Sequence, residues 1–195
     1  EAKGGYLLLL NNDTEMINDD CLNELLSYTE RDDVGITGAR LLYEDNTVQH
    51  AGVVIGYNGL AGHTFVGNEP DDVGYRAYVI QARDYSAVTA ACLMVKASLY
   101  DEVDGFEEEL EVAFNDVDFC LKVREKGYLV VYNPYAVLHH YESKSRGYED
   151  TPEKRNRFEK EAFFTYNKWE KILADGDPCY NPNLTLSNSD FSLRE

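Results

Sequence analysis

The sequence predicts an α/β domain in which helices flank a sheet. Short apolar runs of strand length alternate with segments whose apolar residues recur at helical spacing. The first run, Tyr6–Leu10, stops at Asn11-Asn12-Asp13, as a buried parallel strand does at its carboxyl end. Ligands of open α/β sheets bind at that edge. With 195 residues, the chain is long enough for one domain with a real core.

The first half of the chain predicts strands, one helix and a long connection. The elements expected are a strand at Tyr6–Leu10, a helix at Asp19–Tyr28, a strand at Val34–Tyr43 and a partner strand within Thr47–Tyr57. The polar turn Glu44-Asp45-Asn46 joins the last two segments and predicts a hairpin. Residues 58–82 contain four glycines and little periodicity, which indicates a binding loop or lid.

The second half predicts more helix. The elements expected are a buried strand at Val88–Val95, helices at Ser98–Val103 and Asp116–Lys126, and short strands at Leu129–Tyr132 and Ala136–Leu138. A last helix has Thr151 as its cap and Pro152 as its first residue, and it ends near Gly176. Its apolar stripe is formed by Phe158, Ala162, Tyr166, Trp169 and Leu173. We expect a domain over 1–176 and an extended tail over 177–195.

Charge and composition exclude several classes of function. Lys and Arg number 18 against 36 Asp and Glu, so the formal net charge is −18. A surface this negative repels phosphate backbones, so nucleic acid is not an expected partner. An anionic substrate needs a local counter-charge, which a divalent cation can supply. No apolar run approaches the roughly 20 residues that span a bilayer.

The cysteines indicate the redox compartment, and the start of the chain indicates whether sequence is missing before it. Cys21, Cys92, Cys120 and Cys179 form no CxxC pair, which favours a reducing compartment. The first strand begins almost at once, with no basic segment or cleavage site before it. We therefore expect the chain to be a piece of a larger protein.

Two polar clusters at the ends of elements are candidates for chemistry. Asn11-Asn12-Asp13 is either a strand-to-turn cap or a ligand of a hard cation such as Mg²⁺ or Mn²⁺. Asn115-Asp116-Val117-Asp118 begins a helix, so its acids are either N-caps or a general base at the positive end of the helix dipole.

A third cluster is rich in histidine and cations. His139 and His140 close a strand, and Lys144 and Arg146 follow in a loop. The histidines are either ordinary hydrogen-bonded residues, or one of them binds a metal while the two cations bind a diphosphate. His50 and His63 are ambiguous between these two roles.

Six motifs occur in a fixed order along the chain. They are NND after the first strand, QHAGVVIG (Gln49–Gly56), AVTAACLMVK (Ala87–Lys96), GFEEEL, AFNDVDFCLKVREKGY (Ala113–Tyr128) and HHYESKSRG. In this order they resemble the catalytic domain of family 2 inverting glycosyltransferases with the GT-A fold. The closest resemblance is to bacterial enzymes that build surface polysaccharides, in which YNPNL (Tyr180–Leu184) and DFSL also recur. The resemblance covers nearly the whole chain and implies a GT-A-type mixed sheet flanked by helices.

The resemblance assigns roles to two of the clusters. Asn11-Asn12-Asp13 falls on the DxD motif, so Asp13 would bind the metal that bridges the donor diphosphate, and Asn11 stands where the first Asp would be. Asp116 matches the catalytic base of the ED motif, in which Asn115 replaces the Glu.

For the third cluster, the resemblance selects His140 over His139 as the late metal ligand. Lys144 and Arg146 would close over the diphosphate. In the family the nucleotide-binding strands precede the DxD, so we expect this chain to lack them, to be inactive alone and to self-associate.

The resemblance implies transfer of a sugar from a nucleotide-diphosphate donor to an acceptor hydroxyl, with inversion and with Mg²⁺ or Mn²⁺. The acceptor would be a saccharide or a lipid-linked saccharide of bacterial surface polysaccharide synthesis. The location would be cytoplasmic, free or at the inner face of the membrane. Two alternatives stay open: a non-catalytic carbohydrate- or protein-binding module, and a metal-dependent sugar-nucleotide hydrolase or pyrophosphorylase.

Overall fold

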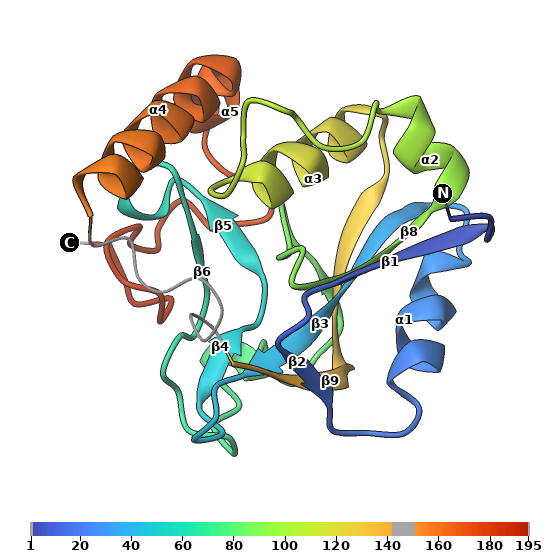
Figure 1. Cartoon of the computed structure of the whole chain (residues 1–195). Coiled ribbons are helices and arrows are strands. Elements are labelled where there is room, and N and C mark those ends of the chain that lie inside the picture. The colour runs from blue at the N-terminus through green and yellow to red at the C-terminus, as the bar shows by residue number, and fades with distance from the viewer. Residues whose placement is uncertain (1, 142–150, 195) are drawn as a thin grey trace.

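The computed structural model describes residues 2–141 and 151–194 (Figure 1). The strands are β1 (Tyr6–Leu10), β2 (Thr14–Met16), β3 (Val34–Leu42), β4 (Val48–His50), β5 (Val53–Ile55), β6 (Ala61–His63), β7 (Arg83–Asp84), β8 (Cys92–Lys96) and β9 (Leu129–His140). The helices are α1 (Cys21–Thr29), α2 (Ala97–Glu102), α3 (Asn115–Glu125), α4 (Pro152–Lys168) and α5 (Glu170–Asp175), with 3₁₀ turns η1 (Tyr57–Gly59) and η2 (Tyr75–Ala77).

A mixed seven-stranded sheet is the centre of the fold. Its main path runs β1-β8-β3-β9-β2, while β4 pairs with β3 and β7 with β9. The β3–β9 pair is parallel, and the other pairs are antiparallel. β5 and β6 form a separate two-stranded sheet.

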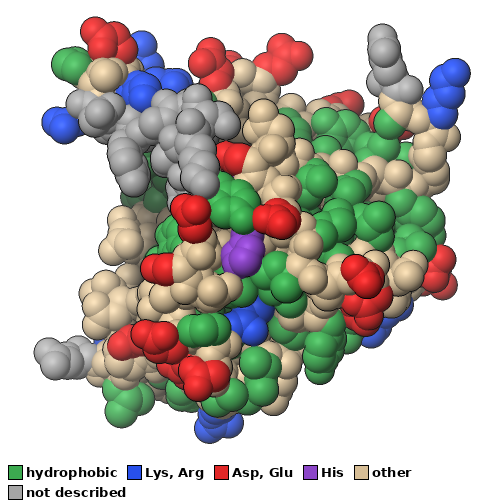
Figure 2. All heavy atoms as spheres, turned by 60° about the horizontal axis from the view of Figure 1, so that its bottom comes forward, with side chains coloured by type: hydrophobic (Ala, Val, Ile, Leu, Met, Phe, Trp, Pro, Cys, Tyr) green, Lys and Arg blue, Asp and Glu red, His purple; other side chains and the backbone are tan. Residues whose placement is uncertain are grey.

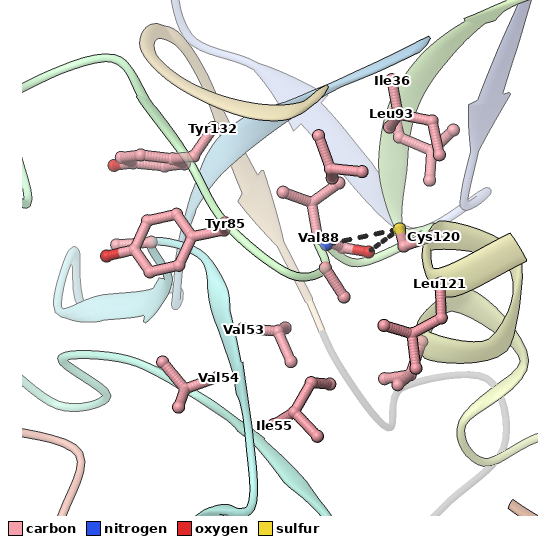
Figure 3. Close-up of a cluster of buried hydrophobic side chains, with 14 of the residues drawn as sticks. Ile36, Val53, Val54, Ile55, Tyr85, Val88, Leu93, Cys120, Leu121 and Tyr132 are labelled. Atoms are coloured by element: carbon pink, nitrogen blue, oxygen red, sulfur yellow. Dashed lines mark hydrogen bonds between the residues drawn. The ribbon is translucent and has the colours of Figure 1, made fainter. Parts of the chain in front are cut away.

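Hydrophobic cores cover both faces of the sheet. Alternate side chains of β8 belong to different cores, because successive residues of a strand point to opposite faces. Leu93 and Val95 pack in the core that includes α3 residues such as Cys120, and Figure 3 shows part of that core. Cys92 and Met94 pack with α1 on the other face. Among the described residues, no helix combines the length and apolar character needed to cross a bilayer.

The expectation of a buried parallel strand at Tyr6–Leu10 is wrong. β1 lies at the edge of the sheet and pairs antiparallel with β8, in register from Tyr6 opposite Lys96 to Leu10 opposite Cys92. Tyr6 and Leu10 are 38% and 43% exposed. A continuous apolar run therefore marks this edge strand, although such runs are typical of buried parallel strands.

Other strands differ in length from the predictions: the two predicted at Leu129–Tyr132 and Ala136–Leu138 are one strand, and the one predicted at Val88–Val95 begins later. β9 is one strand across Asn133-Pro134, where the pairing with β3 shifts register between Ala39 and Arg40. A bulge accommodates Pro134, which cannot donate to a ladder hydrogen bond. The strand predicted at Val88–Val95 begins only at Cys92, since the Val88 N–H donates to Cys120 Sγ instead of to a neighbouring strand.

The predicted hairpin is confirmed. The segment Thr47–Tyr57, predicted to hold one partner strand, contains two strands, β4 and β5, with a bend between them. Leu41 pairs with His50 and Leu42 with Val48 across β3 and β4. The chain then bends at Gly52 and continues as β5, which pairs with β6 inside the long connection over 58–82. That connection also holds η1 and η2.

The last helix is capped as predicted and buries the predicted stripe only in part. The Lys154 N–H donates to Thr151 Oγ1, which confirms the cap. Trp169 of the stripe is buried and Leu173 packs against the core, but Phe158 and Tyr166 are 43% and 48% exposed, and the helix is divided at Trp169 into α4 and α5. The buried residues of α4 are polar instead: Glu161 accepts a 2.6 Å hydrogen bond from the Ala113 N–H, and Thr165 donates to the Glu161 carbonyl.

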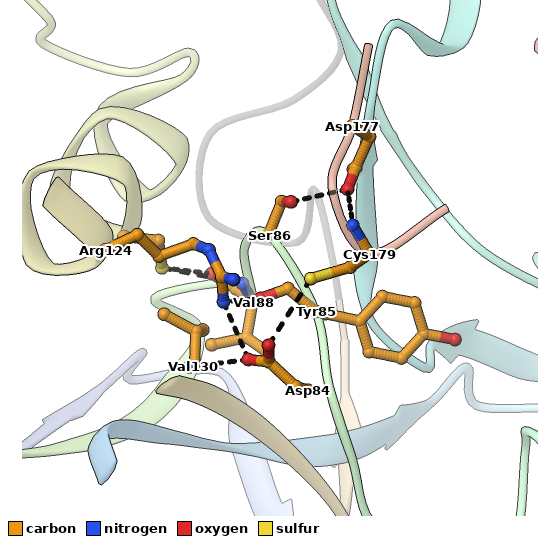
Figure 4. A network of polar contacts seen from close by, with 9 residues as sticks. Asp84, Tyr85, Ser86, Val88, Arg124, Val130, Asp177 and Cys179 are labelled. Carbon is orange, nitrogen blue, oxygen red and sulfur yellow. Dashed lines mark hydrogen bonds and ion pairs between the residues drawn. The ribbon is translucent and has the colours of Figure 1, made fainter. Parts of the chain in front are cut away.

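Buried carboxylates hold the C-terminal segment on the domain. Asp118 of α3 accepts from Trp169 Nε1 at 2.8 Å and lies 2.8 Å from Lys168 Nζ. Asp177 accepts from the Ile55 N–H and, as Figure 4 shows, from Ser86 Oγ and the Cys179 N–H. Burial raises the pKa of the Asp177 carboxyl.

Gly52 provides a test of how tightly the bend after β4 is packed. Its φ is +105°, and a Cβ there would lie 2.4 Å from the Tyr85 ring. We expect Gly52→Ala to lower the free energy of unfolding by about 2–4 kcal/mol, through backbone strain and overpacking.

Gly59 offers a matched control, because it has φ +90° and open space around its Cβ position. Gly59→Ala should cost only about 1 kcal/mol, since it carries the strain alone. Urea denaturation of both variants measures the two values. Equal losses would show that the Tyr85 contact is easily relieved.

Candidate active site

A cleft of about 1130 Å³ opens where β1, β6, β9 and the first turn of α3 meet. Four of the sequence-predicted residues line it: Asn11, Asp13, Asp116 and His140. Asn115 also lines it. On the face shown in Figure 2, a histidine is visible at the surface with acidic side chains near it. The structure thus brings these distant segments together on one cleft.

Chain topology brings Asp13 to His140. β1 and β2 lie at opposite edges of the sheet, and residues 11–13 link them, so that the Tyr141 N–H donates to the Asp13 carbonyl at 2.9 Å. Its start is held by the Asn11 N–H, which donates to the Ala91 carbonyl at 3.0 Å. β2 then pairs with the end of β9, where Thr14 lies opposite His140.

Asp13 and His140 form a close pair at this edge. Asp13 Oδ1 lies 3.3 Å from His140 Nε2, and Asn11 Nδ2 lies 3.2 Å from the same nitrogen. The side chains of Asp13 and His140 are only 17% and 11% exposed. Both are therefore held at the wall of the cleft.

The side chain of Gln49 determines which nitrogen of His140 faces Asp13. Gln49 Nε2 donates to the backbone carbonyl of His140 at 3.3 Å, so its Oε1 faces the ring, 2.7 Å from Nδ1. Since Oε1 can only accept, Nδ1 carries the proton. In the neutral ring, Nε2 then presents a lone pair toward Asp13.

The Asp13–His140 pair fits a hard divalent cation. A carboxylate oxygen and a bare imidazole nitrogen are both acceptors, so a cation or a proton between them relieves their repulsion. Neighbouring ligands of an octahedral ion at about 2.1 Å lie about 3 Å apart, close to the separation seen here. In the described part of the chain, no group of three or more His, Cys, Asp or Glu side chains could hold a metal. Substrate oxygens would therefore have to complete the coordination.

Asp116 lies on the opposite wall, in the first turn of α3. Its Oδ1 accepts from the Val117 N–H at 2.8 Å and its Oδ2 from the Ala90 N–H at 3.2 Å. The N-cap of α3 is Phe114, with φ +61° and no side-chain cap bond. The reading of Asp116 and Asp118 as N-caps is therefore wrong: Asp118 is a buried anchor, and Asp116 faces the cleft.

The other histidines have different surroundings. His139 lies 2.9 Å from Asn46 Oδ1 and does not line the cleft. His63 lines the cleft, with Nδ1 3.1 Å from the Gln49 carbonyl. His50 is fully buried, and burial, then the nearby His63 and His140, lowers its pKa well below the usual range, so the ring is neutral.

Sequence reasoning missed Gln49, and two predicted residues are not tested. The signal for Gln49 was its place at the start of the QHAGVVIG motif, which assigned it no role of its own. Lys144 and Arg146 lie outside the described residues.

Comparisons with known proteins add relatives of much greater length. No protein-family model matches the chain. The uncharacterized protein y4gI of Sinorhizobium fredii (strain NBRC 101917 / NGR234) is 47% identical over 194 residues, which is 99% of this chain and 21% of that protein. The O-antigen biosynthesis protein RfbC of Myxococcus xanthus is 36% identical over 198 residues, which is 100% of this chain and 15% of that protein. The chain thus spans about a fifth or less of these relatives.

Solved structures share the fold at low sequence identity. GalNAc-T7, crystallised with UDP, GalNAc and Mn²⁺, matches with a TM-score of 0.63 and 11% identity over 88% of this chain and 33% of that chain. The mannosyltransferase PcManGT from Pyrobaculum calidifontis, in complex with GDP-Man and Mn²⁺, matches with a TM-score of 0.54 and 15% identity over 87% of this chain and 40% of that chain. The predicted GT-A-type fold, a mixed sheet flanked by helices, is confirmed.

The contact between Gln49 and His140 can be tested through metal affinity. Gln49→Leu keeps the volume but removes the acceptor for Nδ1, so the ring is free to protonate on Nε2 or to turn. Such partners of metal-binding histidines are typically worth 10- to 100-fold in affinity. We expect Mn²⁺ affinity, measured by calorimetry with UDP or GDP present, to fall by about tenfold or more.

Two further variants make this test specific. Gln49→Glu retains the acceptor and should lose less affinity than Gln49→Leu. His139→Ala changes the neighbouring histidine, which lies outside the cleft, and should bind Mn²⁺ as the unaltered protein does. Equal affinity of Gln49→Leu and the unaltered protein, with unchanged melting temperatures, would contradict the role given to Gln49.

Proposed function

We propose that this chain carries the catalytic site of a glycosyltransferase that moves a sugar from a nucleotide-diphosphate donor to an acceptor hydroxyl with inversion. The observation that carries the proposal is the placement of a cation-binding pair, Asp13 and His140, and a separate carboxylate, Asp116, on one cleft. The nucleotide sugars and Mn²⁺ in the structures of similar fold support it. Similarity to an O-antigen biosynthesis protein supports a role in bacterial cell-surface polysaccharide synthesis.

Different residues of the cleft have different roles in such a transfer. Asp13 and His140 would hold Mg²⁺ or Mn²⁺, and Asn11 beside them would contact the donor. A cation held there would supply positive charge against the diphosphate that leaves. The protein thus supplies two ligands, and the donor phosphates supply others.

Asp116 acts as the general base. As the acceptor oxygen forms its bond to the anomeric carbon, the bond from that carbon to the diphosphate oxygen breaks, and its electron pair leaves with the nucleoside diphosphate. The proton of the acceptor hydroxyl passes to the Asp116 carboxylate. Because attack and departure occur on opposite faces of the carbon, a single displacement inverts its configuration.

Substitution of the base tests this assignment. Asp116→Asn retains the side-chain shape and one of two backbone hydrogen bonds but cannot take a proton. In the protein that carries this chain, we expect sugar transfer to fall by about 10²- to 10⁴-fold, the usual contribution of a general base. Binding of UDP or GDP with Mn²⁺ should change little.

Asp101→Asn, an exposed change on α2 outside the cleft, is the matched control and should keep nearly full activity. If Asp116→Asn retained activity and only lowered the melting temperature, Asp116 would be a structural residue.

The stereochemistry of the product tests the mechanism independently. A single displacement predicts that a product from an α-linked donor is β-linked, which the anomeric coupling constant in a proton NMR spectrum reports for gluco- and galacto-configured sugars. A product with retained configuration would overturn the role of Asp116 as the base. Free sugar as the main product would indicate a hydrolase instead.

A further inference from the structure

A second cavity, of about 630 Å³, adjoins the cleft. Gly62 and His63 of β6 line both cavities, so the two meet along this strand. The other walls come from η1, from the segment after β6 and from residues 186–190 of the C-terminal segment. We call this second cavity the tail groove.

The walls of the tail groove are fixed by hydrogen bonds on two sides. The Asn58 N–H donates to the Leu186 carbonyl at 3.2 Å, and the Phe65 N–H donates to the Ser189 carbonyl at 2.8 Å. Behind the wall, Phe191 stacks on Phe65 with ring centroids 4.7 Å apart. The groove is therefore built by packing between segments more than one hundred residues apart in the chain.

The lining of the tail groove is rich in neutral hydrogen-bonding groups. It includes the side chains of Asn58, Asn68, Ser187, Asn188 and Ser189. Val66 and Leu186, 41% and 38% exposed, add apolar surface. Amides and hydroxyls beside small apolar surfaces suit the hydroxyl groups and C–H faces of a sugar ring.

The charged residues that line the tail groove disfavour the binding of anions. Among the described residues that line the tail groove there is no Lys or Arg, and the carboxylate present is Asp190. Hydrogen bonds from Ser192 lower the pKa of Asp190, so this group stays ionised near neutral pH. An ionised carboxylate accepts hydrogen bonds from sugar hydroxyls and repels phosphates.

We infer that the tail groove binds a neutral saccharide that serves as the acceptor. This inference rests on the proposed function, under which the donor diphosphate lies at Asp13 and His140. The acceptor would extend from the tail groove past His63 into the cleft, where its reacting hydroxyl meets Asp116. The C-terminal segment thereby determines which acceptor the site accepts.

The test measures saccharide binding directly. Saturation-transfer NMR is recorded on the protein that carries this chain, with methyl glycosides of glucose, galactose, mannose and N-acetylgalactosamine, and with UDP and GDP plus Mn²⁺ in separate samples. The double variant Ser187→Ala, Asn188→Leu removes two hydrogen-bonding side chains from exposed positions of the groove. We expect it to weaken glycoside binding by about tenfold, as two lost hydrogen bonds imply, and to leave nucleotide binding unchanged.

Asn183→Leu is the matched control, since Asn183 is exposed on the same segment and lies outside the groove. It should bind glycosides as the unaltered protein does. Thermal melts of all variants check the fold.

The outcomes separate the two proposals. Nucleotide binding without any glycoside signal, or equal glycoside binding by the double variant and Asn183→Leu, overturns the inference while the proposed function stands. Glycoside binding that the double variant weakens, together with failure of both nucleotides and of transfer, supports a saccharide site in the groove but overturns the proposed function and with it the acceptor role.

Discussion

The hydrogen bonds from Gln49 to His140 are the interaction on which the candidate site depends. They hold His140 at its backbone carbonyl and at its ring, and they turn Nε2 toward Asp13. Gln49 is placed by the β3–β4 hairpin, and His140 ends β9, which runs parallel to β3. A slip of one residue in the hairpin would turn Gln49 to the other face. The register of three strands thus determines the chemistry of one imidazole.

The position of Asp13 depends on a different constraint, the path of the chain across the sheet. β1 and β2 are close in sequence and lie at opposite edges of the sheet, so residues 11–13 pass from the Ala91 carbonyl, which accepts from the Asn11 N–H, to the end of β9, where Tyr141 donates to the Asp13 carbonyl. The polar residues there are placed by the topology rather than by a turn between adjacent strands. This crossing explains how a segment near the N-terminus reaches a histidine at the end of β9.

Periodicity and residue type predicted much of the fold and the three polar clusters, and the resemblance selected Asp13, Asp116 and His140 within them. The helix beginning near Asp116, the hairpin and the cap at Thr151 follow from local signals that act within a few residues. Asp13, Asp116 and His140 stand at the ends of elements, where a sheet gathers its polar side chains.

What sequence reasoning missed depends on contacts between distant segments. The predicted stripe is right at Trp169 and Leu173 but wrong at Phe158 and Tyr166, because α4 buries Glu161, which accepts from the Ala113 N–H, instead. β9 continues through Pro134 because a bulge accommodates it. Gln49 has no local signal of its role, since that role lies in two hydrogen bonds to a residue 91 positions away.

The negative charge of the protein affects the substrates of the two cavities differently. The net charge is −18, and cations such as Arg124 and Lys168 are already paired with Asp84 and Asp118. The described lining of the cleft contains Asp13 and Asp116 and no Lys or Arg. Two like charges 4 Å apart repel by about 4 kcal/mol at an effective dielectric constant of 20.

Against the described lining, a diphosphate would meet such repulsion, which a divalent cation would offset together with Lys144 and Arg146 in the role that the resemblance gives them. Under the proposed function, the divalent ion then aids binding of the donor as well as its departure. A neutral saccharide meets no such barrier and needs only the amides and hydroxyls of the tail groove. The same acidic surface thus gives the metal a part in the entry of one substrate and leaves the entry of the other independent of it.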